Sequence, residues 1–238
     1  TEEESKQIVR DLSKSLKQGE VALFPSWETL PFERVSPTIE TMGRRSEVLW
    51  RLRNGMNPKV VVATARSVSQ ILASTSYPSP IRLTQGKTID YDTLLKNLFE
   101  YGYHRTSQVE RRGEYAVRGS IIDIYPSTSD TPIRIDIWGD EIERLTTFSV
   151  ADQRSKKPEK TINVFPAREL IPSQGIRNEA TKLLETQSWG KEHWQRFQNH
   201  EFFEGMQSWL PWLETSHDTF IDLFPSDGVI FLLEPNRI

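Results

Sequence analysis

The sequence predicts an α/β protein in which a parallel-sheet domain is interrupted by a smaller, mixed β-rich domain of the α+β type. Residues 60–64 and 229–233 are almost continuously apolar, which is typical of strands buried on both faces of a parallel sheet. Residues 115–125 and 133–145 instead mix β-branched, aromatic and polar side chains in alternation, which is typical of strands with one buried and one solvated face. The chain is therefore expected to contain two kinds of sheet.

Two connectors set the expected domain limits. Residues 74–80 (STSYPSP) are rich in serine and proline, and residues 151–158 are mostly polar. Such stretches favour loops over helices and strands. We therefore expect the α/β domain at 1–78 and 155–238, with the β-rich domain inserted at 79–154.

The first α/β segment is expected to alternate helices and strands. Apolar side chains between residues 2 and 18 recur at helical spacing and are followed by Gly19, a frequent helix-ending residue. In chain order we expect a helix at 2–18, a strand at 21–25, a helix at 41–53, a strand at 60–64 and a short helix over 68–72.

The inserted domain is expected to begin with a helix and to continue as paired strands. Asp90 supplies an N-cap and Gly102 an end signal for that helix. Gly119 marks a bend or bulge in the first strand pair, and Gly139 separates the two strands of the second.

Charged side chains follow these strands and are therefore presented on a rigid sheet. The favoured interpretation is purely structural: a solvated sheet face with cross-strand ion pairs. Acid–base catalysis by a carboxylate pair is less favoured, because arginines lie close to both carboxylates in sequence. The residues concerned are Arg118, Asp123, Arg134, Asp136 and Arg144.

The last segment is expected to be helical before it ends in a strand. Helices are predicted at 176–188 and 191–203, and the apolar run at 229–233 predicts a buried parallel strand. Helical spacing favours a core position for the aromatic side chains here, and stacking on single-stranded bases is the competing interpretation. The tryptophans concerned are Trp189, Trp194, Trp209 and Trp212.

Composition excludes several classes of site. The chain has no cysteine, which removes disulfides and thiolate zinc sites. The net charge is −3, and residues 101–160 carry ten Lys and Arg against ten Asp and Glu, so no basic nucleic-acid footprint is visible. No apolar run is long enough for a membrane span. The four histidines lack metal-ligand spacing, and neither a metal site nor a catalytic site is expected.

A nucleotide-binding loop is not expected either. Gly86, Lys87 and Thr88 supply the last three positions of a phosphate-binding loop, but Ile81 stands where its first glycine is needed. We therefore expect no cofactor in this chain.

Several ordered motifs resemble the amino-terminal, UvrB-like module of the transcription-repair coupling factors. They lie at residues 27–37, 113–119, 138–143 and 148–155, and the resemblance extends over nearly the whole chain. UvrB shares the glycine–arginine and acidic-hairpin motifs. It is less similar near the start, because residues 24–60 leave too little chain for the long damage-probing hairpin of UvrB.

The resemblance implies a non-catalytic module that recruits UvrA to stalled RNA polymerase in nucleotide excision repair. The UvrA-binding positions of the family fall on Arg105 and Arg118, with Tyr125 as an apolar contact. Where UvrB has a further arginine this chain has Ala116, so one guanidinium fork is missing. The planar guanidinium of arginine can donate two hydrogen bonds to one carboxylate. We therefore expect the partner surface to carry acidic side chains.

The resemblance also implies a setting for the chain. It begins at Thr1 without a methionine, and we expect it to be a piece of a longer, cytoplasmic protein. Its α/β domain would be P-loop-like with a degenerate, lost nucleotide loop. The parent would be an ATP-dependent DNA translocase whose remaining part holds ATP and Mg and contacts RNA polymerase and double-stranded DNA. The alternative is a nucleic-acid-binding fragment of a UvrB-type damage-recognition protein.

Overall fold

A six-stranded sheet forms the middle of the protein in the computed structural model, which describes residues 1–30, 33–73, 79–214 and 218–233. Neighbouring strands are antiparallel, except for the parallel first pair. In spatial order the strands are β4 (His104–Arg105), β5 (Glu114–Arg118), β6 (Ile121–Ile124), β7 (Ile133–Trp138), β8 (Glu141–Phe148) and β9 (Ser155–Pro158). The two predicted strand pairs are thereby confirmed.

Helix α4 (Tyr91–Glu100) covers one face of this sheet. The Asp90 carboxylate accepts a hydrogen bond from the Thr93 N–H at 3.0 Å, which confirms the predicted N-cap. Gly102 ends the turn after the helix with φ +77°, a conformation that side chains disfavour. Leu94 and Leu98 project from the helix into the same core cluster as the buried isoleucines of β6 and β7.

A short antiparallel pair closes the middle of the chain. Strand β3 (Ile81–Thr84) pairs with β10 (Thr161–Val164), and side chains of both strands join the core under the six-stranded sheet. Strand β10 thus lies beyond the limit expected at residue 154, and residues 74–78, at the other limit, are outside the described residues. The domain limits therefore stay a prediction.

The first segment of the chain forms a smaller parallel sheet. β1 (Val21–Phe24) pairs in parallel with β2 (Val60–Ala63), so the parallel arrangement predicted for these strands is confirmed. Three helices accompany them, namely α1 (Glu2–Leu12), α2 (Ile39–Arg53) and α3 (Ala65–Ser69). Helix α1 ends at Leu12 rather than near residue 18, and the serines that follow are weak helix formers.

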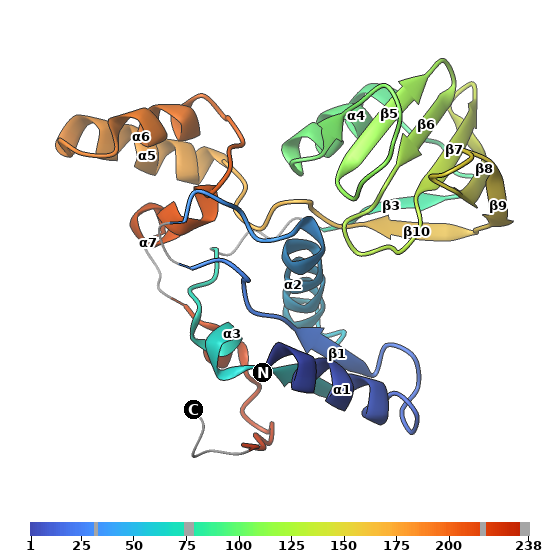
Figure 1. Ribbon diagram of the computed structural model, residues 1–238. Coiled ribbons are helices and arrows are strands. Elements are labelled where there is room, and N and C mark those ends of the chain that lie inside the picture. The colour runs from blue at the N-terminus through green and yellow to red at the C-terminus, as the bar shows by residue number, and fades with distance from the viewer. Residues whose placement is uncertain (31–32, 74–78, 215–217, 234–238) are drawn as a thin grey trace.

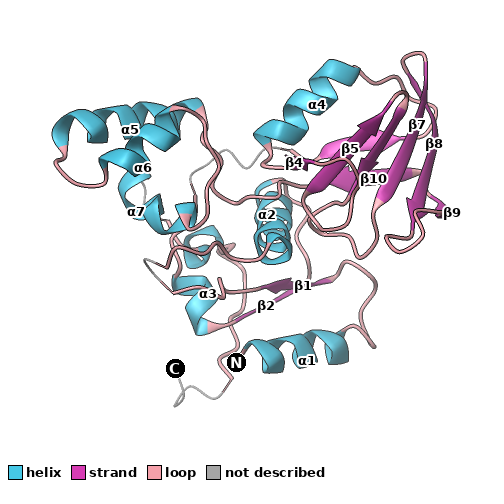
Figure 2. Ribbon diagram, turned by 45° about the horizontal axis from the view of Figure 1, so that its top comes forward, coloured by secondary structure: helices cyan, strands magenta, loops and turns pink. Residues whose placement is uncertain are grey.

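Helix α2 lies between the two sheets in both views (Figures 1 and 2). Its Arg45 is completely buried and forms a two-pronged ion pair with Glu169, with Nε–Oε2 at 2.8 Å and Nη2–Oε1 at 3.1 Å. Trp27 donates to the same carboxylate at 2.8 Å. On the same helix Gly43 is in such close contact with Ser127 that a Cβ would collide with it. We call this region, from α2 to Glu169, the junction.

A helical unit follows the junction. It consists of α5 (Gln174–Thr186), α6 (Lys191–Gln198), α7 (Leu210–Leu213) and the 3₁₀ turn η1 (Met206–Trp209), and the 3₁₀ turn η2 (Phe220–Leu223) comes later. Trp194 and Phe197 are fully buried in its core. Trp189 is 41% exposed, and its ring contacts those of Trp194, Trp209 and Trp212. The core interpretation is therefore confirmed for Trp194, and Trp209 and Trp212 pack against the same core as partly buried side chains, whereas it is wrong for the exposed Trp189.

The strand predicted at 229–233 is wrong. These residues form no strand, and each of the five side chains is 60–84% exposed. A continuous apolar run records a tendency to be buried, but a strand also needs a neighbour for its backbone hydrogen bonds. No such neighbour lies beside this run among the described residues. The protein is thus mixed α/β with sheets of both orientations.

Candidate protein-interaction face

The six-stranded sheet has one face toward α4 and a second face that we call the outer face. On β7 the alternation is regular, with Ile133, Ile135 and Ile137 in the core and Arg134, Asp136 and Trp138 on the other side. The register of β5, β6 and β8 extends this outer face. Its members, besides those three of β7, are Ala116, Arg118, Ile121, Asp123, Arg144, Thr146 and Phe148.

A shared carboxylate organises the centre of the outer face. Asp123 is fully buried and accepts from Arg134 Nε at 2.7 Å and from Arg134 Nη2 at 2.8 Å. The Arg134 guanidinium also lies 4.7 Å from the centroid of the Phe148 ring. Hydrogen bonding to Asp123 raises the pKa of Arg134. This arginine is therefore held, charged, in one position.

Arg118 is the second arginine on that carboxylate, at the rim of the face. Its Nη2 donates to Asp123 Oδ2 at 2.5 Å, while 46% of its side chain remains exposed. Farther along, Arg144 pairs with Asp136 at 3.1 Å. The cross-strand ion pairs expected from the alternation are thus confirmed. Two arginines share one carboxylate, so the cluster keeps an excess positive charge at Arg118.

Arg105 does not join this cluster. It lies on the edge strand β4 in register with Tyr115, whose side chain belongs to the core on the α4 side. Burial raises the pKa of Tyr115, and the charge of Arg105 partly opposes that shift. Arg105 and Arg118 therefore lie on opposite sides of the sheet, at the edge formed by β4 and β5.

Tyr125 is half-buried on the outer side, beyond the end of β6. Its ring packs with the buried cluster of Val109, Ala116 and Phe148, and its hydroxyl donates to the Asp130 carbonyl at 3.0 Å. The ring is thus held in place with part of it open to solvent. Arg118 and Tyr125 are on one side of the sheet.

The alanine at position 116 has a physical reason in this fold. Ala116 is 1% exposed and contacts two other buried side chains, Val109 and Phe148. An arginine side chain does not fit this space unless the loop that carries Val109 moves. Here the guanidinium above Phe148 comes instead from Arg134, on another strand.

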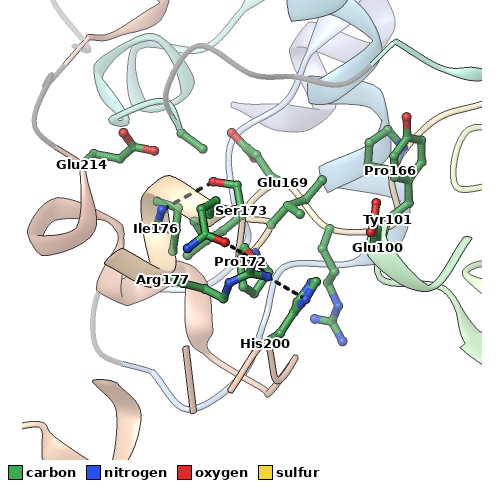
Figure 3. A pocket seen from close by; sticks show the side chains of 15 residues that line it. Glu100, Tyr101, Pro166, Glu169, Pro172, Ser173, Ile176, Arg177, His200 and Glu214 are labelled. Carbon is green, nitrogen blue, oxygen red and sulfur yellow. Dashed lines mark hydrogen bonds between the residues drawn. The ribbon is translucent and has the colours of Figure 1, made fainter. Parts of the chain in front are cut away.

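A separate cavity of about 270 Å³ lies where the end of α4 meets the start of α5 (Figure 3). Arg177 points to His200, with Nη1 3.0 Å from Nδ1. Since a guanidinium only donates, this ring nitrogen accepts. Burial, aided by the charge of Arg177, lowers the pKa of His200. Glu169, which also lines the cavity, is engaged by Arg45, so three charged or titratable groups of the cavity wall already have partners within the protein.

Two further kinds of feature are absent from the part of the chain that the structure describes. No group of three or more His, Asp or Glu side chains there could hold a metal ion. No helix there combines the length and the apolar character that crossing a membrane requires.

Sequence reasoning passed over two residues of the outer face. The sequence predicted Arg134 only as an ion-pair partner of Asp123, although its side chain is the more buried of the two arginines, at 16% exposed against 46% for Arg118. Trp138 was noticed only as part of a motif, although it is 80% exposed. The alternation along β7 was the available signal, because it assigns both to the solvated side.

Comparison with known proteins identifies the unit that carries this face. Residues 81–170 match the family model of the UvrB interaction domain. The match begins at β3 and extends past β10, so it covers the middle of the chain.

Relatives of the chain extend beyond this domain. The transcription-repair-coupling factor of Mycobacterium bovis is 36% identical over 237 residues, which covers 92% of this chain and 19% of the relative. That of Haemophilus influenzae is 30% identical over 231 residues, covering 93% and 20%. That of Bacillus subtilis is 35% identical over 170 residues, covering 71% and 14%. The chain belongs to the transcription-repair-coupling factor family, and it spans no more than about one fifth of the length of these relatives.

Proposed function

We propose that this chain is the non-catalytic, UvrB-like module with which a transcription-repair-coupling factor recruits UvrA. The observation that carries the proposal is the match of residues 81–170 to the UvrB interaction domain. The family is named for an interaction. The matched residues include the six-stranded sheet, on which the half-exposed Arg118 is held by the buried carboxylate of Asp123. UvrA contacts Arg118 and Tyr125 on the outer side and Arg105 around the edge.

The geometry favours a partner that wraps the edge of the sheet. Arg105 and Arg118 lie on adjacent strands but on opposite sides, so a flat partner surface reaches only one of them. Within the described residues Arg105 forms no ion pair, and Arg118 shares its only carboxylate with Arg134. Partner carboxylates would complement both guanidinium groups and speed the encounter.

The wider proposals concern the whole protein. We infer that the parent is an ATP-driven DNA translocase of the cytoplasm that contacts RNA polymerase and double-stranded DNA through parts outside this chain, where ATP and Mg would bind. The parallel β1–β2 pair supports a P-loop-like α/β domain with the β-rich domain inserted in it, although only two strands of that sheet lie in the described residues.

Calorimetric titration of the chain with UvrA tests the recruitment proposal. We expect binding by the wild type and its loss in Arg118→Glu, because a charge reversal at the rim faces the partner carboxylates. Arg82→Glu is the matched control, since Arg82 is an exposed arginine of β3 outside the outer face, and it should bind like the wild type. A folded wild type that fails to bind UvrA overturns the proposal.

A second candidate function is binding of single-stranded nucleic acid on the aromatic cluster of the helical unit. It draws its support from Trp189, which is 41% exposed. It predicts affinity for an oligonucleotide that falls steeply with salt. Trp194 is fully buried, which leaves little ring surface for stacking. We therefore expect no measurable binding of the oligonucleotide at any salt concentration.

A further inference from the structure

Trp138 is a large apolar side chain that the protein leaves in solvent. It is 80% exposed at the end of β7, beside the turn that leads to β8. Tryptophan is on average highly buried in folded proteins. Among the ring contacts of the described residues, none involves Trp138. Packing within the chain therefore does not account for this residue.

The support beneath Trp138 is rigid. Ile137 and Ile142 face each other across β7 and β8 and are both buried in the core. Gly139, at φ +58°, makes the tight turn between the strands. The loop after β3 braces the hairpin through the Ile89 N–H, which donates to the Asp140 carbonyl at 2.7 Å. An exposed ring on such a base loses little conformational entropy when it binds.

Trp138 lies on the same side of the sheet as Arg118. Along one row of the sheet Arg118 pairs with Ile121, Ile121 with Asp136, and Asp136 with Arg144. Trp138 is the next residue of β7 on that side, about 7 Å beyond Asp136. The indole of Trp138 therefore lies on the same outer face as Arg118, the half-exposed arginine proposed to contact UvrA.

The charges around the indole differ from those around Arg118. A shallow hollow is lined by Trp138, Glu141 and Glu143. Asp140 adds a third carboxylate within the same turn, and the basic residue nearest in sequence, Arg144, is paired with Asp136 at 3.1 Å. The outer face thus changes from positive at the Arg118 rim to negative at the Trp138 tip.

We propose that Trp138 is the apolar anchor of the UvrA-binding face. Its indole enters an apolar recess of UvrA whose rim carries Lys or Arg side chains, and these meet Glu141 and Glu143. The inference rests on the proposed recruitment of UvrA and specifies the partner surface: acidic opposite Arg118, basic around the recess. Tryptophan and arginine are the residue types that most often dominate the affinity of protein interfaces.

The test is a calorimetric titration of UvrA with the wild type, Trp138→Ala, Trp138→Phe and the double variant Glu141→Lys/Glu143→Lys. Loss of an anchor of this kind lowers affinity at least about thirtyfold. We expect that loss for Trp138→Ala, a loss of less than about tenfold for Trp138→Phe, and weaker binding for the double variant. Met56→Ala removes another exposed apolar side chain, one that is 44% exposed and lies away from the sheet, and should change nothing.

The outcomes separate the two proposals. If the wild type binds UvrA and Trp138→Ala binds equally well, the anchor is overturned while recruitment stands. If the wild type does not bind, both proposals fail. Because the indole makes no ring contact in the described part of the chain, Trp138→Ala should melt within a few degrees of the wild type. Trp138→Gln repeats the test if the alanine variant aggregates, and wild-type affinity for it would likewise overturn the anchor.

Discussion

Two arginine–carboxylate clusters in this protein are built from the same groups and differ in how completely they are enclosed. At the junction, Arg45 and Glu169 are 0% and 1% exposed, and they bind each other, the Pro25 carbonyl and the Trp27 indole. On the outer face Asp123 is as deeply buried, but the side chain of Arg118 is 46% exposed. The first arrangement holds distant segments together. In the second arrangement the buried carboxylate of Asp123 holds both Arg118 and Arg134 in place, and Arg118 stays accessible. Such an arrangement suits a binding surface.

The largest effect is expected from opening the closed cluster. Glu169→Leu leaves Arg45 charged, buried and without its carboxylate, and such changes destabilise proteins by about 3–5 kcal/mol. Denaturant unfolding followed by circular dichroism measures the loss. The double variant Arg45→Met/Glu169→Leu should recover most of it, because no unpaired charge remains. Equal stability of Glu169→Leu and the wild type would contradict the role assigned to the junction.

A smaller loss is expected from crowding the junction without changing its charge. Gly43→Ala places a Cβ against Ser127, and overpacking of this kind costs about 1–3 kcal/mol. The same unfolding measurement checks it. Gly43→Ala combined with Ser127→Gly provides the control, since removal of the serine side chain frees the space and should restore part of the stability.

At the open cluster, stability and binding should separate. Arg118→Ala removes a half-exposed ion pair, and we expect a change of at most about 1 kcal/mol in the free energy of unfolding. Its affinity for UvrA should nevertheless fall strongly, which calorimetry measures. A stability loss as large as that of Glu169→Leu would mean that both clusters are structural and that the contrast between them is false.

A small effect of acid is expected at the cavity between the end of α4 and the start of α5, where His200 lies. Burial lowers the pKa of His200 below its usual 6.5, so the unfolded chain binds more protons than the folded one as the pH falls below about 6.5. Stability therefore decreases with falling pH until the folded pKa is passed. His200→Gln should reduce the dependence of the free energy of unfolding on pH below about 6.5. Denaturant unfolding at several pH values measures this, and an unchanged pH dependence would argue against a lowered pKa of His200.

Much of the middle unit followed from local pattern. Alternation along β7 and β8, with glycine at the turn, predicted the hairpin and the pairing of Asp123 and Asp136 with arginines. The position of Arg105 could not be predicted in the same way. It depends on a parallel pairing of two residues, His104 and Arg105, with β5, and so short a strand has no periodicity.

Contacts between distant segments were also beyond the sequence patterns. Arg45 and Glu169 are 124 residues apart, and neither lies in a motif that indicates a partner. The run at 229–233 shows the converse error, because its apolar character was read as burial while the neighbouring strand it requires is missing from the described residues. Local pattern identified the strands that pair with their neighbours in the chain and failed where pairing depends on remote ones.

The pairing of β3 with β10 has a consequence for how this unit is connected. The chain enters at residue 81 and leaves at residue 164 through two residues that face each other in register. Both ends of the unit thus lie at one place, and the surrounding protein is connected to it through a stem of two strands. A segment spanning β3 to β10, transplanted by that stem into a loop of an unrelated scaffold, should fold there and carry the outer face with it.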